Sequence, residues 1–388
     1  MKKKQILYAA ILSIGMATTS CSDYLNVSDK LEDTAQSLDK IFTSKEFSEQ
    51  WLAQAYAYLT RYNSDIHDRG WCLTNFADDY IFCDDLAELR RFKYAEYDEE
   101  FHRDAWYDAY NGIRQASIFI HNIDRNTEFT PEQRKDYKAQ ARFVRAYLYW
   151  KLLQKYGPIP LMPDEGMDYS LSYEDIATPR STYDECADFI AREMVQAAYD
   201  LPEDRDSRNI ARPTRGAALA ARAKVLLYAA SPINNPGGPG DPLPSERFAD
   251  LVDDEGRPLM GQDYQEARWA KAAAAARDVV EMGKRGVYRL YTVKARSEGT
   301  PDYPATITPP KHSVYSYENY PEGWADIDPL QSYQNLFNGN LYPSDNPEMV
   351  FTTGQNFNAY WLAMRGMPME IGGWNCYAMT GKQCDAYE

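Results

Sequence analysis

Two pairs of adjacent aspartates are the residues of this sequence best suited to acid–base chemistry: Asp78-Asp79 and Asp84-Asp85. Glycoside hydrolysis uses a pair of carboxyl groups, one as the acid and the other as base or nucleophile. Adjacent aspartates more commonly serve as solvated loop charges or as helix caps. We therefore favour a structural role for these pairs over a catalytic one.

The other reactive side chains form no specific catalytic or metal-binding pattern. The four histidines, His67, His102, His121 and His312, are not spaced as a metal pair, and HExxH does not occur. A GxSxG turn and a phosphate-binding glycine loop are also missing from the sequence. A calcium site built from loop carboxylates stays open, although there is no EF-hand pattern. The sequence thus predicts a binding protein, not an enzyme, that works without a cofactor.

Aromatic residues are abundant, with 31 Tyr and 8 Trp. A flat ring presents an apolar face, and Tyr and Trp add a polar group. Sugar rings have apolar C–H faces and polar edges, so aromatics in loops beside Asn, Asp, Gly or Pro suit a neutral carbohydrate. The alternative is that they only fasten long loops to the rest of the protein. The loop residues concerned are Trp71, Asn75, Tyr315, Tyr317, Tyr320, Trp324, Tyr360, Trp361, Trp374 and Asn375.

Helical periodicity dominates the elements that must position these side chains. Helices are expected near residues 43–59, 106–120, 130–156, 182–200, 214–230 and 263–283. The third is the best defined: Thr130 and Gln133 form a capping box around Pro131, and Gly157-Pro158 ends the helix. Its apolar stripe comprises Tyr137, Ala141, Val144, Leu148 and Leu152.

Two further capping boxes are expected, at Thr43 with Glu46 and at Asp263 with Glu266. The helices come in pairs, and alanine recurs on faces where neighbours must approach closely, as in tetratricopeptide-type hairpins. The expected fold is therefore mainly α, a superhelix of tetratricopeptide-like helix pairs with a loop-rich ligand-binding region. Residues 231–261 and 300–347 are expected to be irregular, because they are rich in Pro, Gly or Asn.

The N-terminus resembles a lipoprotein signal. Lysines follow Met1, residues 6–17 are mostly apolar, and the small residues 18–20 precede Cys21. The apolar run is shorter than the roughly 20 residues needed to span a bilayer. We predict a signal peptide at 1–20 and a lipidated Cys21, as in a bacterial lipobox, although Thr18 replaces the usual Leu. Several acyl chains give stable anchoring, whereas one is marginal. The alternative is ordinary secretion.

The net charge of −16 argues against nucleic acid, which requires concentrated Lys and Arg, and is compatible with a neutral ligand. Beyond Cys21 no stretch is long and apolar enough to cross a membrane. An oxidising envelope would permit Cys72–Cys83 and Cys376–Cys384 disulfides. We favour free buried thiols for these cysteines and for Cys186, and the pairing stays open.

Several segments together resemble the SusD/RagB-like outer-membrane lipoproteins of Bacteroidetes. They are CSDYLN at 21–26, ARFVRAY at 141–147, YGPIP at 156–160, RSTY at 180–183, ARPTRGAA at 211–218, NPEMVF at 346–351 and DAYE at 385–388. The resemblance covers nearly the whole chain. It implies tetratricopeptide-like helix pairs with a loop-rich region packed on them.

The resemblance also implies a surface-exposed, lipid-anchored protein that binds a glycan without cleaving it and passes it to a SusC-like TonB-dependent transporter. The segment from Trp71 to Asp79, with Asn75 and Asp78, is similar to one ligand-binding region of the family. Further expected ligand-binding residues are Tyr315, Tyr317, Tyr320, Trp324 and Trp361. We expect a single SusD-like helical domain at 21–388 that lacks the family's C-terminal part.

The predicted function is therefore glycan capture at the outer membrane, facing the cell exterior. One alternative is a relative that binds peptides or another nutrient. Another is a protein–protein scaffold in which the helical groove binds a partner. A third is a glycosidase that uses two of the loop aspartates.

Overall fold

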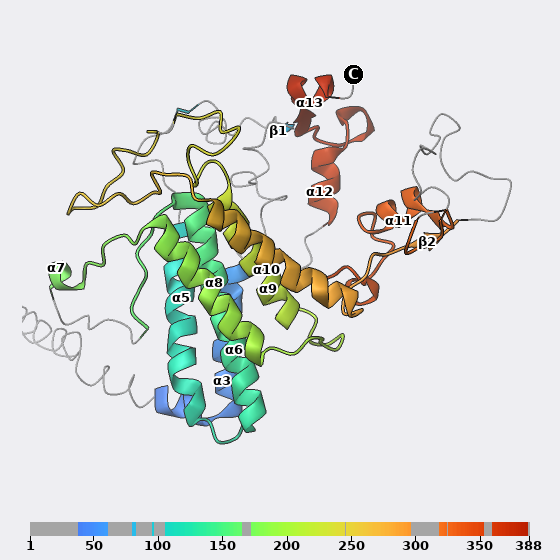
Figure 1. The fold of residues 1–388 in the computed structure, drawn as a ribbon. Helices are drawn as coiled ribbons and strands as arrows, with labels where there is room; N and C mark the ends of the chain where they lie inside the picture. Colours follow the sequence, from blue (N-terminus) through green and yellow to red (C-terminus); the bar gives the residue numbers. More distant parts are fainter. Residues whose placement is uncertain are drawn as a thin grey trace, which may run out of the picture.

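The structure, a computed structural model, describes residues 38–60, 80–82, 95–96, 105–164, 172–244, 246–295, 318–323, 325–352 and 359–386. Within these ranges, long helices form a row in which each packs on the next. They are α3 (Lys45–Thr60), α5 (Ala105–Asn122), α6 (Pro131–Tyr156), α8 (Tyr183–Asp200), α9 (Arg215–Ala230) and α10 (Glu266–Lys284). Figure 1 shows this row, with α5 on one side and α10 on the other. The predicted mainly α fold of stacked helix pairs is confirmed.

Helix α6 begins and ends where the sequence predicts. Thr130 Oγ1 accepts a hydrogen bond from the Gln133 backbone N–H at 3.2 Å, and Gln133 Oε1 accepts one from the Thr130 backbone N–H at 3.0 Å. Gly157 follows the last turn with φ at +68°, a backbone angle that favours glycine. On the predicted stripe, Tyr137 is half-buried and the other four residues are buried.

Helices α8 and α9 also start where the sequence predicts, and a threonine caps each of them. Thr182 and Glu185 form a second capping box, with the Thr182 backbone N–H 2.7 Å from Glu185 Oε2. Thr214 Oγ1 accepts from the Ala217 backbone N–H at the start of α9. Short linkers therefore join α5 to α6, through the 3₁₀ turn η3 (Ile123–Arg125), and α8 to α9, as expected for helix hairpins.

The two other predicted capping boxes were wrong, because distant side chains satisfy these helix starts. The hydroxyl of Thr43 donates to the Asp39 carbonyl, and the backbone N–H of Lys45 donates to Glu128 Oε2 at 2.5 Å. Helix α10 begins after Gln265, whose side chain makes no cap hydrogen bond. The side chain of Asn235 binds both the N–H and the carbonyl of Gln265.

Small residues allow the helices to approach closely, as predicted. A Cβ atom at Gly112 of α5 would lie 2.5 Å from Leu148 Cδ1 of α6 and 2.8 Å from Tyr58 Cβ of α3. Alanines fill the contact between α8, α9 and α10: Ala191, Ala230, Ala272 and Ala275. A larger side chain on these faces would push the helices apart, since protein interiors are close-packed.

The segments that follow α6 and α9 are mostly irregular. Between α6 and α8, the short helix α7 (Tyr173–Ile176) interrupts the loop. Residues 231–261 contain no helix in their described positions, as predicted. The prediction for 300–347 was wrong in part: α11 (Pro329–Asn335) forms there because Asp328 Oδ1 caps the Gln331 N–H and Pro329 starts the first turn. The 3₁₀ turn η5 (Pro343–Asp345) follows α11. Strand β3 (Ile327–Asp328), which directly precedes α11, pairs antiparallel with β2 (Val293–Lys294).

The last described residues form a small C-terminal lobe. It contains α12 (Ala359–Gly366), the 3₁₀ turn η6 (Met369–Ile371), β4 (Tyr377–Met379) and α13 (Gly381–Asp385). Strand β1 (Tyr80–Phe82) pairs antiparallel with β4 and so belongs to this lobe in space (Figure 1). None of the described helices is both long and apolar enough to cross a membrane.

The described cysteines are free thiols. Cys186 and Cys376 are buried, and Cys384 is exposed. The Cys376–Cys384 disulfide left open by the sequence is therefore not formed, in agreement with the favoured prediction of free thiols. The prediction that these thiols are buried is confirmed for Cys186 and Cys376 and was wrong for Cys384, which is exposed. Cys72 and Cys83 lie outside the described residues.

Candidate functional site

Most of the predicted ligand-binding residues lie outside the described part of the chain. These are Trp71, Asn75, Asp78, Tyr315, Tyr317 and Trp324, and the same holds for Cys21. Trp361 lies on α12, but its side chain is not among those described. The site is therefore built from the described segments that connect to these residues.

Tyr320 is the one predicted ligand residue whose side chain the described ranges include. Its ring is 37% exposed. The Tyr320 N–H donates to Asp326 Oδ1 at 2.8 Å, and the Ala325 N–H donates to the Glu318 carbonyl at 2.9 Å. This turn leads directly into β3 and α11 and presents the ring at the surface, as a sugar-stacking residue requires.

The pairing of β1 with β4 joins two segments that the sequence places far apart. Tyr80 lies opposite Met379, and Phe82 lies opposite Tyr377. Strand β1 directly follows the 71–79 segment, in which Trp71, Asn75 and Asp78 were predicted. Strand β4 directly follows Trp374-Asn375, a further loop aromatic with an amide beside it. The sheet thus connects both candidate segments to one lobe.

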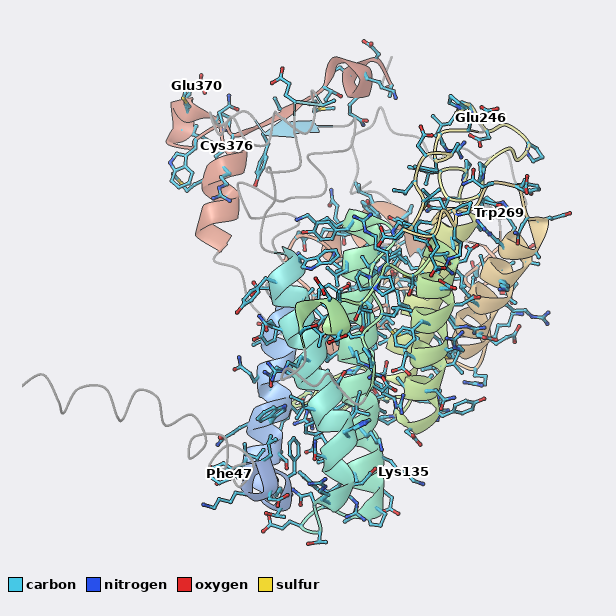
Figure 2. The ribbon with its side chains drawn as sticks, turned by 90° about the vertical axis from the view of Figure 1, so that its left-hand side faces the viewer. Phe47, Lys135, Glu246, Trp269, Glu370 and Cys376 are labelled. Carbon is cyan, nitrogen blue, oxygen red and sulfur yellow. The ribbon has the colours of Figure 1, made fainter. Side chains whose placement is uncertain are left out.

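Trp374 is held at the surface by the fold of this lobe. Its N–H donates to the Met364 carbonyl of α12 at 2.6 Å, and the Asn375 N–H donates to the Met367 carbonyl at 3.0 Å. Gly373, the residue before Trp374, has no room for a side chain, because an added Cβ would overlap the Met367 carbonyl. The Trp374 side chain remains 36% exposed. Figure 2 shows the neighbouring residues Cys376 and Glu370 in the same lobe.

Backbone contacts therefore bring α12, the helix that carries Trp361, against the loop that carries Trp374. The Cys376 N–H donates to the Arg365 carbonyl at 2.8 Å and closes this contact. An exposed indole with an adjacent amide suits a neutral sugar, because the ring covers the apolar face and the amide bonds hydroxyl groups. Among the described residues, no group of His, Cys, Asp and Glu is arranged to hold a metal ion.

A second exposed aromatic surface is formed by Tyr333 of α11 and by Phe337, which follows the end of this helix, and sequence reasoning missed it. The rings of Tyr333 and Phe337 are 5.0 Å apart between centroids, tilted by 51°, and exposed. The amides of Asn338 and Asn340 both donate to Asn335 Oδ1 at 3.3 Å. The spacing of the two aromatics by four residues was the available signal, because residues four apart lie close together wherever the chain is helical.

A groove of about 720 Å³ runs along α5. Trp106, Tyr107 and Arg114 line it on the helix, and Met162 and Asp164 line the opposite side. This groove could not be foreseen from the sequence, because its far wall comes from residues 160–164 and 176–178, which lie far from α5 along the chain.

Buried hydroxyl groups hold that far wall in place. The Tyr110 hydroxyl donates to the Pro160 carbonyl at 2.8 Å, and the Tyr149 hydroxyl accepts from the Met162 N–H at 3.0 Å. Burial raises the pKa of Tyr110, and it raises the pKa of Tyr149 to about 12, so both stay neutral. These two hydrogen bonds attach Pro160 to α5 and Met162 to α6.

Comparison with known proteins decides the family. The SusD-like family described as "Starch-binding associating with outer membrane" matches residues 23–227, more than half of the chain. The chain belongs to the SusD-like family. Its members associate with the outer membrane, as the family description states.

Individual SusD-like relatives are distant. SusD-like protein P25 of Formosa agariphila is 26% identical over 125 residues, which cover 32% of this chain and 23% of that protein. The solved structure of BT4246 has 23% identity and a TM-score of 0.52, and the match covers 64% of this chain and 41% of that one. A SusD-like carbohydrate binding protein of Bacteroides fragilis, BF0978, has 15% identity and a TM-score of 0.48, and the match covers 87% of this chain and 52% of that one.

The likeness to BT4246 shows that the SusD-like fold is shared. This chain spans less than a quarter of the length of P25 and about two fifths of BT4246. The family match ends within α9, so it includes the 71–79 segment and does not include Trp374 or α11.

Proposed function

We propose that this SusD-like chain is a glycan-binding protein without enzymatic activity, which captures an oligo- or polysaccharide at the outer membrane. The observation that carries the proposal is the exposed indole of Trp374, held by α12 and joined through β1 and β4 to the 71–79 segment. Aromatic faces stack on sugar rings, and neighbouring amides orient the hydroxyl groups. The family description, with its reference to starch, supports this ligand class.

The proposal includes the place of the protein in the cell. Residues 1–20 would be the signal peptide, Cys21 the lipidated N-terminus, and residues 21–388 one SusD-like domain facing the cell exterior. A SusC-like TonB-dependent transporter would receive the bound glycan. The basic and apolar N-terminal pattern supports the signal, and the outer-membrane association of the family supports the location.

Calorimetry of the chain from residue 22 onward against a panel of polysaccharides, beginning with starch, tests the proposal. We expect heat of binding with at least one glycan and weaker binding by Trp374→Ala. Tyr199→Ala is the matched control, because Tyr199 is an exposed aromatic of α8 far from the C-terminal lobe in sequence. The absence of binding to every glycan would contradict the proposal. Release of reducing sugar, lost in Asp78→Ala, would instead indicate a glycosidase.

The groove along α5 favours a second candidate function, the binding of a peptide or a partner protein. Its walls combine apolar side chains with the charged Arg114 and Asp164, as in grooves that receive an extended or helical segment. Tyr107→Ala discriminates between the two functions, because Tyr107 lines this groove and is 71% exposed. Loss of peptide or partner binding in this variant, with glycan binding unchanged, would support the second function.

A further inference from the structure

A smaller hollow lies on the other side of the helical row, where the 231–265 segment covers the start of α10. Its volume is about 380 Å³. The residues that matter for its chemistry are Gly238, Pro239, Asp241, Tyr264, Glu266 and Trp269. Figure 2 places Trp269 and the loop residue Glu246 well apart from the lobe that contains Cys376. The hollow is therefore separate from the site proposed above.

Two aromatic rings form its apolar surface. Tyr264 packs against the backbone of Gly238 so closely that a Cβ atom there would lie 2.6 Å from Tyr264 Cε2. Trp269 lies in the first turns of α10 and is 40% exposed. Pro239 adds a third apolar ring to the wall. The glycines of this loop thus allow the backbone to approach the tyrosine ring.

Buried polar contacts fix the loop that carries these residues. Asn235 is 1% exposed and holds the backbone of Gln265 through both ends of its amide. Asp241 accepts hydrogen bonds from the backbone N–H groups of Gly237 and Leu243 and forms an ion pair with Arg247 at 3.0 Å. The Leu243 N–H bond is the main reason why the pKa of Asp241 lies below its ordinary value. All of these contacts are made within the protein.

Three polar groups at the hollow remain available to a ligand. They are the hydroxyl of Tyr264, the indole N–H of Trp269 and the carboxylate of Glu266, and no described residue forms a hydrogen bond with any of them. All three residues are exposed. The hollow thus combines apolar ring faces with two donors and a carboxylate acceptor, the pattern that matches a pyranose ring.

We propose that this hollow is a second sugar-binding pocket, which takes a short stretch of the same glycan that the C-terminal lobe binds. The proposal rests on the proposed function. A volume of about 380 Å³ is near the lower end of small-molecule sites, so the pocket holds a short oligosaccharide. Two separate sites on one protein bind a long chain more tightly than either site alone, because the second contact is intramolecular.

Binding of a short oligosaccharide and of the parent polysaccharide, each measured by calorimetry on the chain from residue 22 onward, tests this proposal. Trp269→Ala and Trp374→Ala are compared alone and combined. We expect each single variant to keep one oligosaccharide site and the double variant to keep none. We also expect either single variant to bind the polysaccharide about tenfold more weakly, because the intramolecular contact is lost.

Each outcome separates the two proposals. If Trp269→Ala binds both ligands as the wild type does, the second pocket is wrong and the proposed function stands. If the wild type binds no glycan at all, the proposed function fails and the second pocket with it. Tyr264→Phe is a milder variant that should not disturb folding, since it keeps the ring that packs on Gly238 and removes only the hydroxyl. We expect Tyr264→Phe, made in the Trp374→Ala background, to bind the oligosaccharide several-fold more weakly than Trp374→Ala alone.

A cation bound by the aromatic rings and Glu266 is the competing ligand class. Glu266→Gln distinguishes the two, because an amide still accepts hydrogen bonds from sugar hydroxyls but carries no charge. We expect oligosaccharide affinity to change less than about threefold and choline chloride, used as the cation probe, to show no binding. Binding of choline to the wild type that is lost in Glu266→Gln and Trp269→Ala would overturn the sugar assignment.

Discussion

Arg145 of α6 and Glu193 of α8 form a buried ion pair, with Arg145 Nη2 2.5 Å from Glu193 Oε2. Their side chains are 2% and 11% exposed. Burial alone would lower the pKa of Arg145, but the neighbouring Glu193 keeps it above its ordinary value. Arg145 also reaches Asp164, so the pair connects two helices and one wall of the α5 groove.

We expect Glu193→Leu to lower the free energy of unfolding by about 3–5 kcal/mol, because it leaves a buried guanidinium without its main partner. Urea denaturation measures the change. Asp188→Asn is the control, since Asp188 and Lys271 form an exposed pair at 3.4 Å between α8 and α10. That variant should change stability by less than about 1 kcal/mol. Equal losses in both variants would contradict the assigned role of the buried pair.

Close approach of α3, α5 and α6 at Gly112 predicts the effect of a single methyl group. Gly112→Ala should cost about 1–3 kcal/mol, since the added Cβ would overlap Leu148 and Tyr58. Gly283→Ala in α10 is the matched control, because the added Cβ would lie 3.8 Å from the Tyr288 carbonyl oxygen, an ordinary contact distance. Alanine is the better helix former, so the control should be neutral or stabilised by up to about 1 kcal/mol. Denaturation curves in which Gly112→Ala is also neutral would contradict the helix contact.

The capping box of α8 predicts a stability change that depends on pH. The Thr182 N–H bonded to Glu185 is the main reason why the pKa of this carboxyl lies below its ordinary value. A carboxyl with a lowered pKa in the folded state adds stability above its unfolded pKa, about 4.3, and that stability is lost as pH falls through the folded pKa. Glu185→Gln should therefore lower stability at pH 7 and reduce its loss on acidification.

Thr182→Ala should cost about 0.5–2 kcal/mol at pH 7, because it removes the other half of the box. Thr43→Ala is the control: its hydroxyl donates to the Asp39 carbonyl and caps no helix start. We expect a smaller loss there, within about 0.5 kcal/mol. Melting temperatures at pH 7 and pH 3.5 measure the stability of both variants. A larger loss of stability in Thr43→Ala than in Thr182→Ala would support the capping box that the sequence predicted at Thr43.

The cysteines should differ sharply in reactivity. Burial raises the pKa of the Cys186 thiol to about 11, whereas Cys384 is exposed. Because the thiolate is the reactive form, iodoacetamide at pH 8 should modify Cys384 in the native protein and Cys186 only after unfolding. Peptide mass mapping identifies the modified residues. Rapid labelling of native Cys186 would contradict its burial between α6 and α8.

The helical body could be predicted from the sequence because its signals are local. Thr130 and Thr182 each cap the helix that follows them, and Gly157 ends α6 with a positive φ. The starts of α3 and α10 could not be predicted, because Glu128 and Asn235 reach them from distant segments. Helix α11 was missed for a simpler reason: it is a short helix inside a segment whose Pro and Asn content indicates a loop.

The candidate site was predicted by residue type more than by position. Among the loop aromatics named from the sequence, Tyr320 and Trp374 are exposed, and their role in ligand binding stays a prediction. The pairing of Tyr80 with Met379 could not be foreseen, because strands this short have no periodicity to detect. Nor could the α5 groove and the pocket at Trp269, since each needs an irregular segment folded against a helix.

The central claim is that an exposed aromatic ring of the C-terminal lobe binds a glycan. Calorimetry of Trp374→Ala against the glycan that the wild type binds tests it most directly, with Tyr199→Ala as the surface control. We expect at least a tenfold loss of affinity, about 1.4 kcal/mol, in Trp374→Ala, with an unchanged melting temperature and no loss in the control. Wild-type affinity in Trp374→Ala would contradict it.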